Sequence, residues 1–368
     1  MAEAAGNAFI TPEWRDAAVE VYETDGSGTA KEDGRGTTSF VAVWRDGDGE
    51  LRLVLPLIAT RSTGVEMIRM PGFQVGDLFG PATDLDDPAG ALAGIAAAVH
   101  QRFPAAVWMF DNADPAFRDA VAGSPALARF RAIGDTTVPL PHIRFGDEGW
   151  QGFLARRSRN FRSQIGRRRR NLERDHEISF RLTTEARRVA TDLDTVLDLH
   201  LKRWQQRGGS GAITPLSRRF HHRFAAAAFE RGWLRLWILE IDGRPAAGWY
   251  GWRLGDVYSY YQAGFDPRFE DRAVGTVMLA HTIEQAASEG AAVYDLLLGD
   301  EDYKARFANG ERQVVTVAHA PPASMAAGLL RAESLARRAV RAVPAPVKSL
   351  PMRVLRPVVK RLPGGSRR

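Results

Sequence analysis

Residues 258–266 read YSYYQAGFD, and residues 272–277, after a short interval, read RAVGTV. The first stretch predicts a strand over Val257–Gly264, and the second predicts the beginning of a helix over Val274–Glu289. Backbone N–H groups at the start of a helix lack acceptors within the helix and attract anions. A strand that leads through a glycine-containing turn into such a helix therefore predicts a site for a pyrophosphate group.

The segments around this stretch predict an α/β fold. In the first half we expect a hairpin, a second pair of strands, a helix and a buried strand: Phe40–Trp44 with Leu51–Leu57 around the turn residues 46–49, Val65–Met70 with Gln74–Phe79, Ala89–Phe103, and Ala106–Phe110. The second half repeats this order with a hairpin, a strand, a helix and a buried strand: Leu234–Ile241 with Ala246–Arg253, Val257–Gly264, Val274–Glu289, and Ala292–Leu298.

One local match supports an internal repeat. Ala105–Asp111 (AAVWMFD) aligns at an offset of 186 residues with Ala291–Leu297 (AAVYDLL), and each follows an expected helix that begins near Gly90 or Gly275. Two copies of one α/β unit explain the match. The alternative is that any two α/β units share alanine-rich helices and apolar strands.

The chain between the halves predicts two helices. In Trp150–Arg174, apolar residues recur at helical spacing while nine arginines occupy the other faces. The second helix covers Glu185–Gln206, and its last two turns contain His200, Arg203 and Trp204. One interpretation of the arginines is an electropositive wall for an anionic acceptor, for the phosphates of a bound donor or for RNA. Because residues 1–320 carry a net charge of −4, we favour ion pairing of most of the arginines with acidic residues of the chain, with Arg159 and Arg162 as acceptor contacts.

The residues and motifs that the sequence lacks exclude several kinds of catalytic and metal site. The 368 residues include no cysteine, which excludes disulfides, thiolate zinc sites and a cysteine nucleophile. No Gly-x-Ser-x-Gly elbow and no paired histidine spacing of the HExxH kind occurs, so neither a serine hydrolase nor a catalytic metal is indicated.

The net charge of +6 is unevenly distributed, because Arg331–Arg368 contains 11 basic residues and one acid. A helix is expected over Ala326–Ala342, and basic and apolar residues alternate beyond it. This tail predicts either peripheral binding to an anionic membrane or a disordered basic extension. The N-terminus lacks a basic signal region, and the longest small apolar stretch, Ala89–His100, is too short to span a bilayer. We expect a cytoplasmic protein, at most peripheral at the inner face of the membrane.

With these motifs the sequence resembles the GNAT acyltransferase superfamily, in the branch of CelD-like cellulose-biosynthesis proteins and Fem-type tandem acyltransferases. The resemblance covers the element order of most of residues 5–315 and is most specific over 145–310. The GNAT phosphate loop, Gln/Arg-x-x-Gly-x-Gly/Ala, corresponds to Arg272-x-x-Gly275-x-Val277, whose last position departs from the pattern. Glu270 and Asp271 beside the loop repel an anion.

The resemblance implies two tandem GNAT-like units, each with a mixed, mainly antiparallel sheet flanked by helices. It divides the chain into a degenerate N-terminal unit (1–145), an acyltransferase unit (146–320) and a basic tail (321–368). It also implies that the strand ending at Gly264 splays from the strand over 293–297 and that acyl-CoA, with acetyl-CoA as the expected donor, lies in the opening. The implied donor-binding residues are Gln262, Ala263, Gly264, Arg272, Val274, Gly275 and Thr276.

Catalysis in such proteins is direct transfer of the acyl group from the thioester. Asp295, a carboxylate in an apolar strand, is a candidate base or orienting group, with a capped structural aspartate as the alternative. Gly299-x-x-x-Tyr303-Lys304 matches an element of this branch, which makes Lys304 the charge-stabilising candidate and Tyr303 the acid for the leaving thiolate. The alternatives are a solvated lysine and a core tyrosine. A Lys304→Ala variant is expected to lose transfer with little change in thermal stability.

The acceptor pocket is implied by the pattern His200-x-x-Arg203-Trp204, with Tyr261 as a further candidate. Packing is the alternative for His200, Trp204 and Tyr261. The expected function is acyl-CoA-dependent transfer, without a metal, to an amine or hydroxyl of a sugar, amino acid or cell-envelope or exopolysaccharide precursor. The alternatives are Fem-type transfer from aminoacyl-tRNA, which is the one case in which nucleic acid is an expected partner, and a non-catalytic scaffold of polysaccharide synthesis.

Overall fold

The computed structural model describes residues 1–23, 37–62, 64–205, 209, 211–299, 302–322 and 324–342. The chain forms two compact units. Unit 1 contains Ala18–Val138 and the described residues from Gln313 onward, and unit 2 contains Ala2–Ala17 and Pro139–Arg312. The expected loop at 208–211 and the basic segment after residue 342 fall largely or wholly outside the described residues.

Unit 1 is a mixed sheet with helices. Its strands are β1 (Thr37–Arg45), β2 (Leu51–Ser62), β3 (Val65–Arg69), β4 (Ala82–Thr83), β5 (Val107–Ala113) and the parts of β6 (Arg131–Arg144) and β12 (Gly310–Ala320) that lie in this unit. Its helices are α2 (Ala89–Arg102), α3 (Pro115–Ala122) and α10 (Met325–Ala342), with a 3-10 turn at Pro125–Leu127 and a π-helical turn at Val19–Glu23. The strand order is β1-β2-β3-β5-β12-β6, and β4 pairs with β2.

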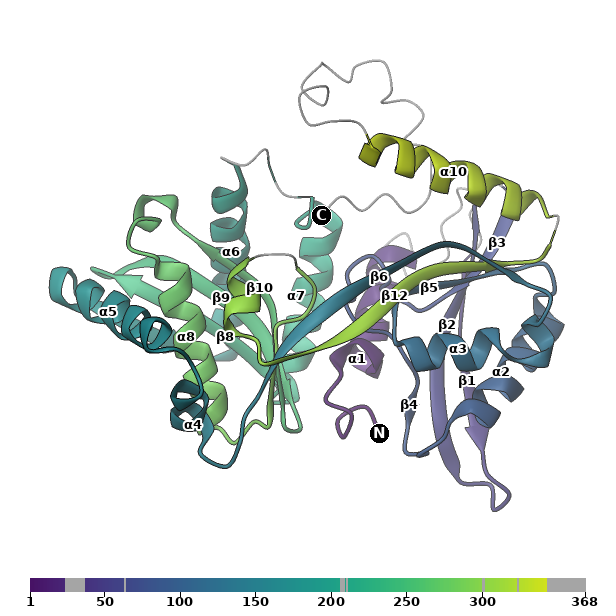
Figure 1. The fold of residues 1–368 in the computed structure, drawn as a ribbon, viewed down its shortest axis with the longest axis horizontal. Coiled ribbons are helices and arrows are strands. Elements are labelled where there is room, and N and C mark those ends of the chain that lie inside the picture. Colours follow the sequence, from purple (N-terminus) through teal and green to yellow (C-terminus); the bar gives the residue numbers. More distant parts are fainter. Residues whose placement is uncertain are drawn as a thin grey trace. The chain divides into compact units, whose positions relative to one another are not determined.

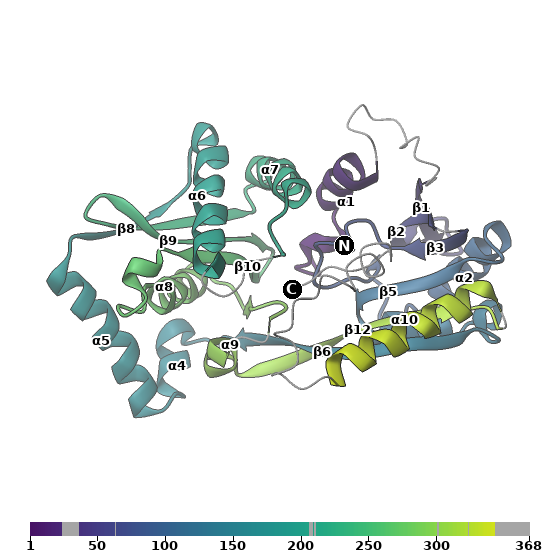
Figure 2. The same cartoon turned by 90° about the horizontal axis from the view of Figure 1, so that it is seen from above.

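Unit 2 repeats this plan. Its strands, in the order β6-β11-β10-β9-β8-β7, are β7 (Ile178–Leu182), β8 (Leu234–Ile241), β9 (Arg244–Leu254), β10 (Val257–Phe265), β11 (Val293–Asp295) and the end of β6. Its helices are α1 (Pro12–Ala18, of which 12–17 lie here), α4 (Gly149–Ala155), α5 (Arg159–Asp175), α6 (Ala186–Gln205), α7 (Pro215–Glu230), α8 (Val274–Ser288) and α9 (Asp302–Phe307), with 3-10 turns at Ala8–Ile10 and Pro267–Phe269. In Figure 2, α6 and α7 cover one face of the β8-β9-β10 sheet, and α8 and α5 cover the other.

The same pairing pattern occurs in both units. In unit 1, β1, β2 and β3 are antiparallel, and α2 connects them to β5, which is parallel to β3. In unit 2, β8, β9 and β10 are antiparallel, and α8 leads to β11, which is parallel to β10. β5 begins at Val107 and β11 at Val293, which is the 186-residue offset found in the sequence. The expected α/β fold, with mixed and mainly antiparallel sheets flanked by helices, is confirmed.

The unit boundaries follow from long-range strand pairing rather than from chain order. β6 continues from unit 1 into unit 2, where its end pairs with β11, and β12 continues from unit 2 into unit 1, where it pairs with β5. The N-terminal segment also packs within unit 2, because Trp14 is fully buried with its ring 4.6 Å from that of Phe220. The units therefore differ from the continuous division at residue 145.

Three local expectations are corrected. Residues 74–79 form no strand, because the preceding Pro71 and Gly72 (φ 77°) turn the chain, and Phe79 makes only an isolated bridge to Ala113. The helix expected over 150–174 is two helices, because Ser158 caps α5 by accepting the N–H of Phe161. The buried strand expected over 292–298 ends at Asp295, since Leu297 takes a left-handed conformation (φ 53°).

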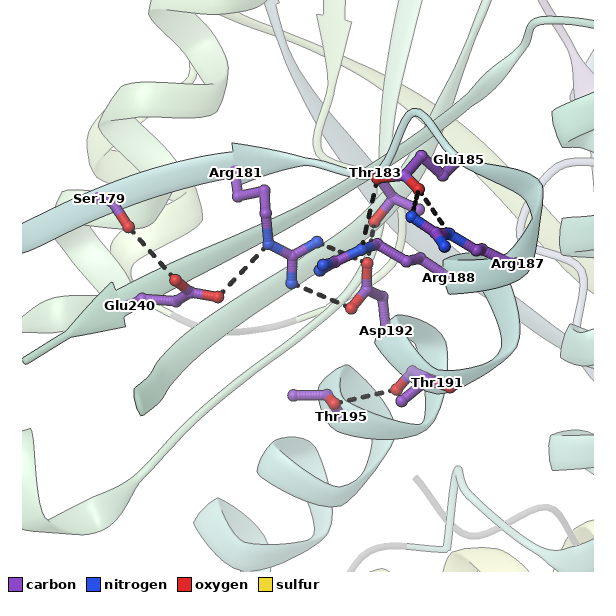
Figure 3. A network of polar contacts seen from close by, with 10 residues as sticks. All are labelled: Ser179, Arg181, Thr183, Glu185, Arg187, Arg188, Thr191, Asp192, Thr195 and Glu240. Atoms are coloured by element: carbon purple, nitrogen blue, oxygen red, sulfur yellow. Dashed lines mark hydrogen bonds and ion pairs between the residues drawn. The ribbon is translucent and has the colours of Figure 1, made fainter. Parts of the chain in front are cut away.

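A polar network holds α6 on the sheet of unit 2 (Figure 3). The Arg181 guanidinium of β7 donates to both carboxylate oxygens of Asp192, at 2.7 and 3.0 Å, and the Thr183 hydroxyl donates to the same carboxylate at 2.6 Å. Burial opposes ionisation of Asp192, but these hydrogen bonds outweigh it and lower the pKa of the carboxyl. The network fixes the start of α6, whose far end carries His200 and Arg203.

The helix expected over Ala326–Ala342 is confirmed as α10. It follows β12 in the chain (Figure 1), and its Ala326 and Ala327 are buried in one cluster with Ala318 of that strand. In the described part of the chain, no helix combines the length and the apolar character that crossing a bilayer requires.

Candidate functional site

A cavity of about 190 Å³ lies in unit 2 between β10 and the beginning of α8. Seven of the residues predicted for the site line it: Arg203, Ala263, Gly264, Val274, Gly275, Thr276 and Tyr303. Trp249, Tyr260, Phe265 and Glu270 also line it, along with smaller contributions from the cores of β9 and α8. The wall is therefore mainly apolar and aromatic, and its polar side chains include a guanidinium, two phenols, a threonine hydroxyl and a carboxylate.

The cavity exists because β10 and β11 separate. They pair only over Val257–Ser259 and Val293–Asp295, while β10 continues to Phe265. The two strands therefore separate after Ser259 and Asp295, as the resemblance implies. A bulge at Tyr261, where the register with β9 shifts, re-aims the following residues of β10. Backbone that pairs with no neighbouring strand on this side can hydrogen bond to an extended ligand.

β10 touches the backbone of α6 at Gly264. A Cβ atom on Gly264 would lie 2.0 Å from the backbone nitrogen of His200, so only glycine permits this approach. The His200 side chain reinforces the contact, because its Nδ1 lies 3.1 Å from the carbonyl oxygen of Ala263, which can only accept. His200 thus positions the end of α6, one turn before Arg203 enters the cavity wall.

The first turn of α8 borders the cavity. Ala273, which precedes the helix, is left-handed (φ 54°), and its carbonyl accepts the N–H groups of Thr276 and Val277 at 2.9 and 3.1 Å. The N–H groups of Val274 and Gly275 have no acceptor within the helix. The side chain of Val277 is 4 % exposed and packs in the core, so its β-branch does not occupy the cradle.

Two phenols meet at the cavity. The hydroxyls of Tyr260 and Tyr303 lie 2.8 Å apart, and both rings line the wall. The Lys304 ammonium group donates to the carbonyl of Leu298 at 2.5 Å and lies 5.3 Å from the centroid of the Tyr260 ring. Lys304 is 4 % exposed, so the alternative of a solvated lysine is wrong. It touches the cavity through Tyr260 rather than as one of the lining residues.

Asp295 is fully enclosed behind the cavity. Its carboxylate accepts the N–H of Leu297 at 2.9 Å and forms an ion pair with Arg312. The side chain is 1 % exposed and is absent from the described cavity wall. This arrangement agrees with the structural alternative, in which the carboxylate fixes the left-handed corner after β11.

The remaining predicted residues lie around the cavity or away from it. Arg272 forms an ion pair with Asp175 at 2.6 Å, and Gln262 lies on β10 between the lining residues Tyr260 and Ala263. Tyr261 packs among the aromatic rings on the other face of the sheet, 5.2 Å from Trp252 and 5.1 Å from His221. Trp204 lies 6.1 Å from the His200 ring at the end of α6.

The nine arginines between Arg156 and Arg174 form fewer ion pairs than the sequence predicts. Among the described residues, only Arg169 and Arg174 of the nine form ion pairs with carboxylates. Arg162 donates to the carbonyls of Ala155 and Arg157, and Arg159 is exposed at the start of α5. Most of this positive charge therefore faces solvent.

Electrostatics at the cavity combine both signs. Arg203 lies 5.1 Å from the centroid of the Phe265 ring, and no carboxylate partner is recorded for it among the described residues. Glu270 is the carboxylate in the described wall, close to the first turn of α8. No group of three or more potential metal ligands occurs within the described ranges.

Tyr260 lines the cavity but is not among the residues predicted from the sequence, because packing explains most tyrosines in strands. The signal that could have found it is the spacing of Tyr260 and Gly264 on the strand that splays. Tyr260 lines the cavity, whereas its neighbour Tyr261 packs with Trp252 and His221 on the other face, as alternation along a strand requires.

The equivalent place in unit 1 is filled. β3 and β5 pair only at Met67–Ile68 and Val107–Trp108, so they also separate, but the cavity there is about 10 Å³. Phe79 is fully buried in its wall, and Arg69 forms two hydrogen bonds with Asp111, at 2.9 and 2.7 Å. Within the described residues, this cavity in unit 1 is therefore too small for a ligand that would fit the cavity of unit 2.

Comparison with known proteins agrees with this geometry. Residues 159–305 match the family model of the acetyltransferase (GNAT) domain. No curated protein matches the sequence. Similar structures include FemX (TM-score 0.58, 10 % identity, covering 86 % of this chain and 96 % of that one) and a conserved protein of unknown function from Bacteroides thetaiotaomicron (0.54, 12 %, 85 % and 91 %). A third is the C-terminal DUF2156 domain of a protein described as a lysylphosphatidylglycerol synthetase from Agrobacterium fabrum (0.51, 12 %, 80 % and 88 %). At these identities the likeness concerns the fold.

Proposed function

We propose that unit 2, in which residues 159–305 match the family model of the acetyltransferase (GNAT) domain, transfers an acyl group from acyl-CoA to an amine or hydroxyl acceptor. The observation that carries the proposal is the cavity between the splayed strand β10 and the first turn of α8. It joins a backbone anion site, a strand edge and a phenol pair, which are the three parts that a phosphate-bearing thioester requires.

The donor would bind along β10. Its pyrophosphate would accept hydrogen bonds from the backbone N–H groups of Val274 and Gly275, where the helix dipole favours negative charge. The amide-containing arm would pair with the backbone groups of β10 that point away from β9, and the aromatic wall would cover its apolar parts. The thioester would then lie toward Tyr260 and Tyr303.

Transfer would proceed by direct attack. The lone pair of the acceptor nitrogen or oxygen forms a bond to the thioester carbonyl carbon, and backbone N–H groups stabilise the oxyanion. The C–S bond breaks, and the Tyr303 hydroxyl donates a proton to the leaving thiolate while Tyr260 supplies a hydrogen bond to the resulting phenolate. The proton lost by the acceptor passes to water, which returns a proton to Tyr303.

Arg203 would select the acceptor. Its guanidinium reaches the cavity from the end of α6 and lacks a recorded acidic partner in the described part of the chain. A guanidinium in this setting favours an acceptor with an anionic or strongly hydrogen-bonding group beside its nucleophile. A sugar, amino acid or cell-envelope or exopolysaccharide precursor, as proposed from the sequence, can carry such a group.

The test is the thermal midpoint of the purified protein with acetyl-CoA and longer acyl-CoAs. A ligand at 100 times its dissociation constant adds about 2.7 kcal/mol of stability, which raises the midpoint by about 5–10 °C in a unit of this size. A Gly275→Val variant should lose the shift, because its Cβ would lie 3.1 Å from the Phe265 ring at the cradle.

Gly90→Val is the matched control. Gly90 occupies the start of α2, the counterpart of α8 in unit 1, and a Cβ there meets no atom within 4 Å. This variant should keep the acyl-CoA response. Absence of a shift with every thioester, or an equal shift in Gly275→Val, would contradict the proposed donor site.

A second candidate function is transfer of an aminoacyl group from aminoacyl-tRNA. It is favoured by the arginines of α5, most of which form no ion pair within the described residues. Binding of tRNA that weakens steeply with salt, in a protein that ignores acyl-CoA, would support this alternative. A protein that responds to neither donor would instead be a non-catalytic scaffold.

A further inference from the structure

Helix α10 presents two different surfaces. Ala326 and Ala327 are buried against the hydrophobic cluster of Val65, Met67 and Ala318, and Leu330 packs against the same cluster. The large apolar residues of the outer side are exposed instead: Met325 by 65 %, Leu329 by 48 % and Leu335 by 66 %. The inner side therefore explains why α10 docks on unit 1, and the outer side needs another explanation.

The exposed residues form a continuous stripe. Met325, Leu329, Ala332 and Leu335 follow one another at separations of three or four residues, which places them on one side of the helix, and all four are exposed. In the whole described chain, eight large apolar residues are exposed by this measure, and three of them lie in this stripe. An apolar concentration of this kind on one helix marks an interaction surface.

The charge around the stripe is positive. Arg331 is exposed beside it, and the sequence of α10 contains four arginines and one acid, Glu333. Seven more basic residues and no acidic residue follow in the sequence between 343 and 368. A protein partner of ordinary composition does not need this excess, whereas a negatively charged lipid surface attracts basic residues and accepts apolar side chains together.

We propose that the outer face of α10 binds an anionic lipid membrane, with Met325, Leu329 and Leu335 entering the region between headgroups and acyl chains. The helix would lie in the plane of the interface, because it carries its apolar residues on one side only. Each nearby basic residue adds attraction to the anionic headgroups that salt weakens. The surface belongs to unit 1, so the proposal does not depend on the chemistry of unit 2.

The experiment is co-sedimentation of the full chain with vesicles. We expect binding to phosphatidylcholine vesicles that contain about 30 % phosphatidylglycerol, at least about fivefold weaker binding to pure phosphatidylcholine, and loss of binding near 0.5 M salt. A Leu329→Ser/Leu335→Ser variant should bind the anionic vesicles at least about tenfold more weakly, since two leucine side chains no longer leave water. Arg331→Gln should weaken binding about fivefold.

Leu216→Ser is the matched control, because Leu216 on α7 is exposed by 43 % and lies outside the stripe. It should bind as the unchanged chain does, and all variants should keep the same thermal midpoint. Binding that is equal on neutral and anionic vesicles, or unchanged in the double leucine variant, would overturn the proposal. So would concentration-dependent dimerisation that the leucine variant abolishes without vesicle binding, because a second copy would then cover the stripe.

Discussion

Replacing Lys304 with alanine should destabilise unit 2. Lys304 is 4 % exposed on α9, and its ammonium group donates to the carbonyl of Leu298 at 2.5 Å. That carbonyl lies between two residues with positive φ, Leu297 (53°) and Gly299 (144°). The lysine therefore fastens the irregular corner that follows β11. The sequence alone predicted little change in thermal stability for this variant, and the burial of the side chain reverses that expectation.

The size of the effect follows from the contacts. A hydrogen bond from a charged donor contributes about 1.5–3 kcal/mol, and its loss leaves the Leu298 carbonyl without this partner. Truncation also removes three buried methylene groups, at about 0.8 kcal/mol each. Relief from burying the ammonium charge offsets part of the sum. We expect a net loss of about 2–4 kcal/mol, or about 5–15 °C in the thermal midpoint of unit 2.

The assay is calorimetric unfolding of the full chain, with Lys202→Ala as the control. Lys202 lies on α6 with an exposed side chain, so its substitution should change stability by no more than about 0.5 kcal/mol. If Lys304→Ala unfolds within about 1 °C of the control, the corner does not depend on the lysine and the argument fails. Activity measured on the folded fraction would separate a role in transfer from this structural one.

Three further results are expected. Glu270→Gln should tighten acetyl-CoA binding about two- to fivefold in low-salt calorimetry, because a carboxylate leaves the wall beside the anion site; unchanged affinity would place the phosphates elsewhere. Burial lowers the pKa of His281 to about 4, whereas the same histidine in the unfolded chain takes up a proton at about pH 6.5. The free energy of unfolding, measured with urea, should therefore fall by about 3 kcal/mol as the pH is lowered to 4. The His281→Phe variant should not show this fall. Arg69→Ala should destabilise unit 1 by about 3–5 kcal/mol, because Asp111 then loses its charged partner. If the double variant Arg69→Met/Asp111→Leu recovers the thermal midpoint, the loss comes from the unpaired charge and not from poorer packing.

Much of the site could be predicted from local sequence. The order of strand, glycine turn and helix around Gly275 is a short-range pattern, and it led to most of the residues that line the cavity. Tyr260 was undervalued because its role depends on the hydroxyl of Tyr303, 43 residues away. The enclosure of Asp295 depends in the same way on Arg312, which approaches from β12.

The sequence by itself determined the local elements, the repeat at an offset of 186 residues and the positions of glycine in the turns, because these depend on neighbouring residues and on φ angles. Three features depended on the tertiary structure: β6 and β12 each run from one unit into the other, Lys304 is buried, and most of the α5 arginines are exposed to solvent. Strand partners, burial and ion pairs are set by residues far apart in the chain. Which residues pair or become buried depends on which surfaces pack together. A periodic pattern along one segment does not specify these surfaces.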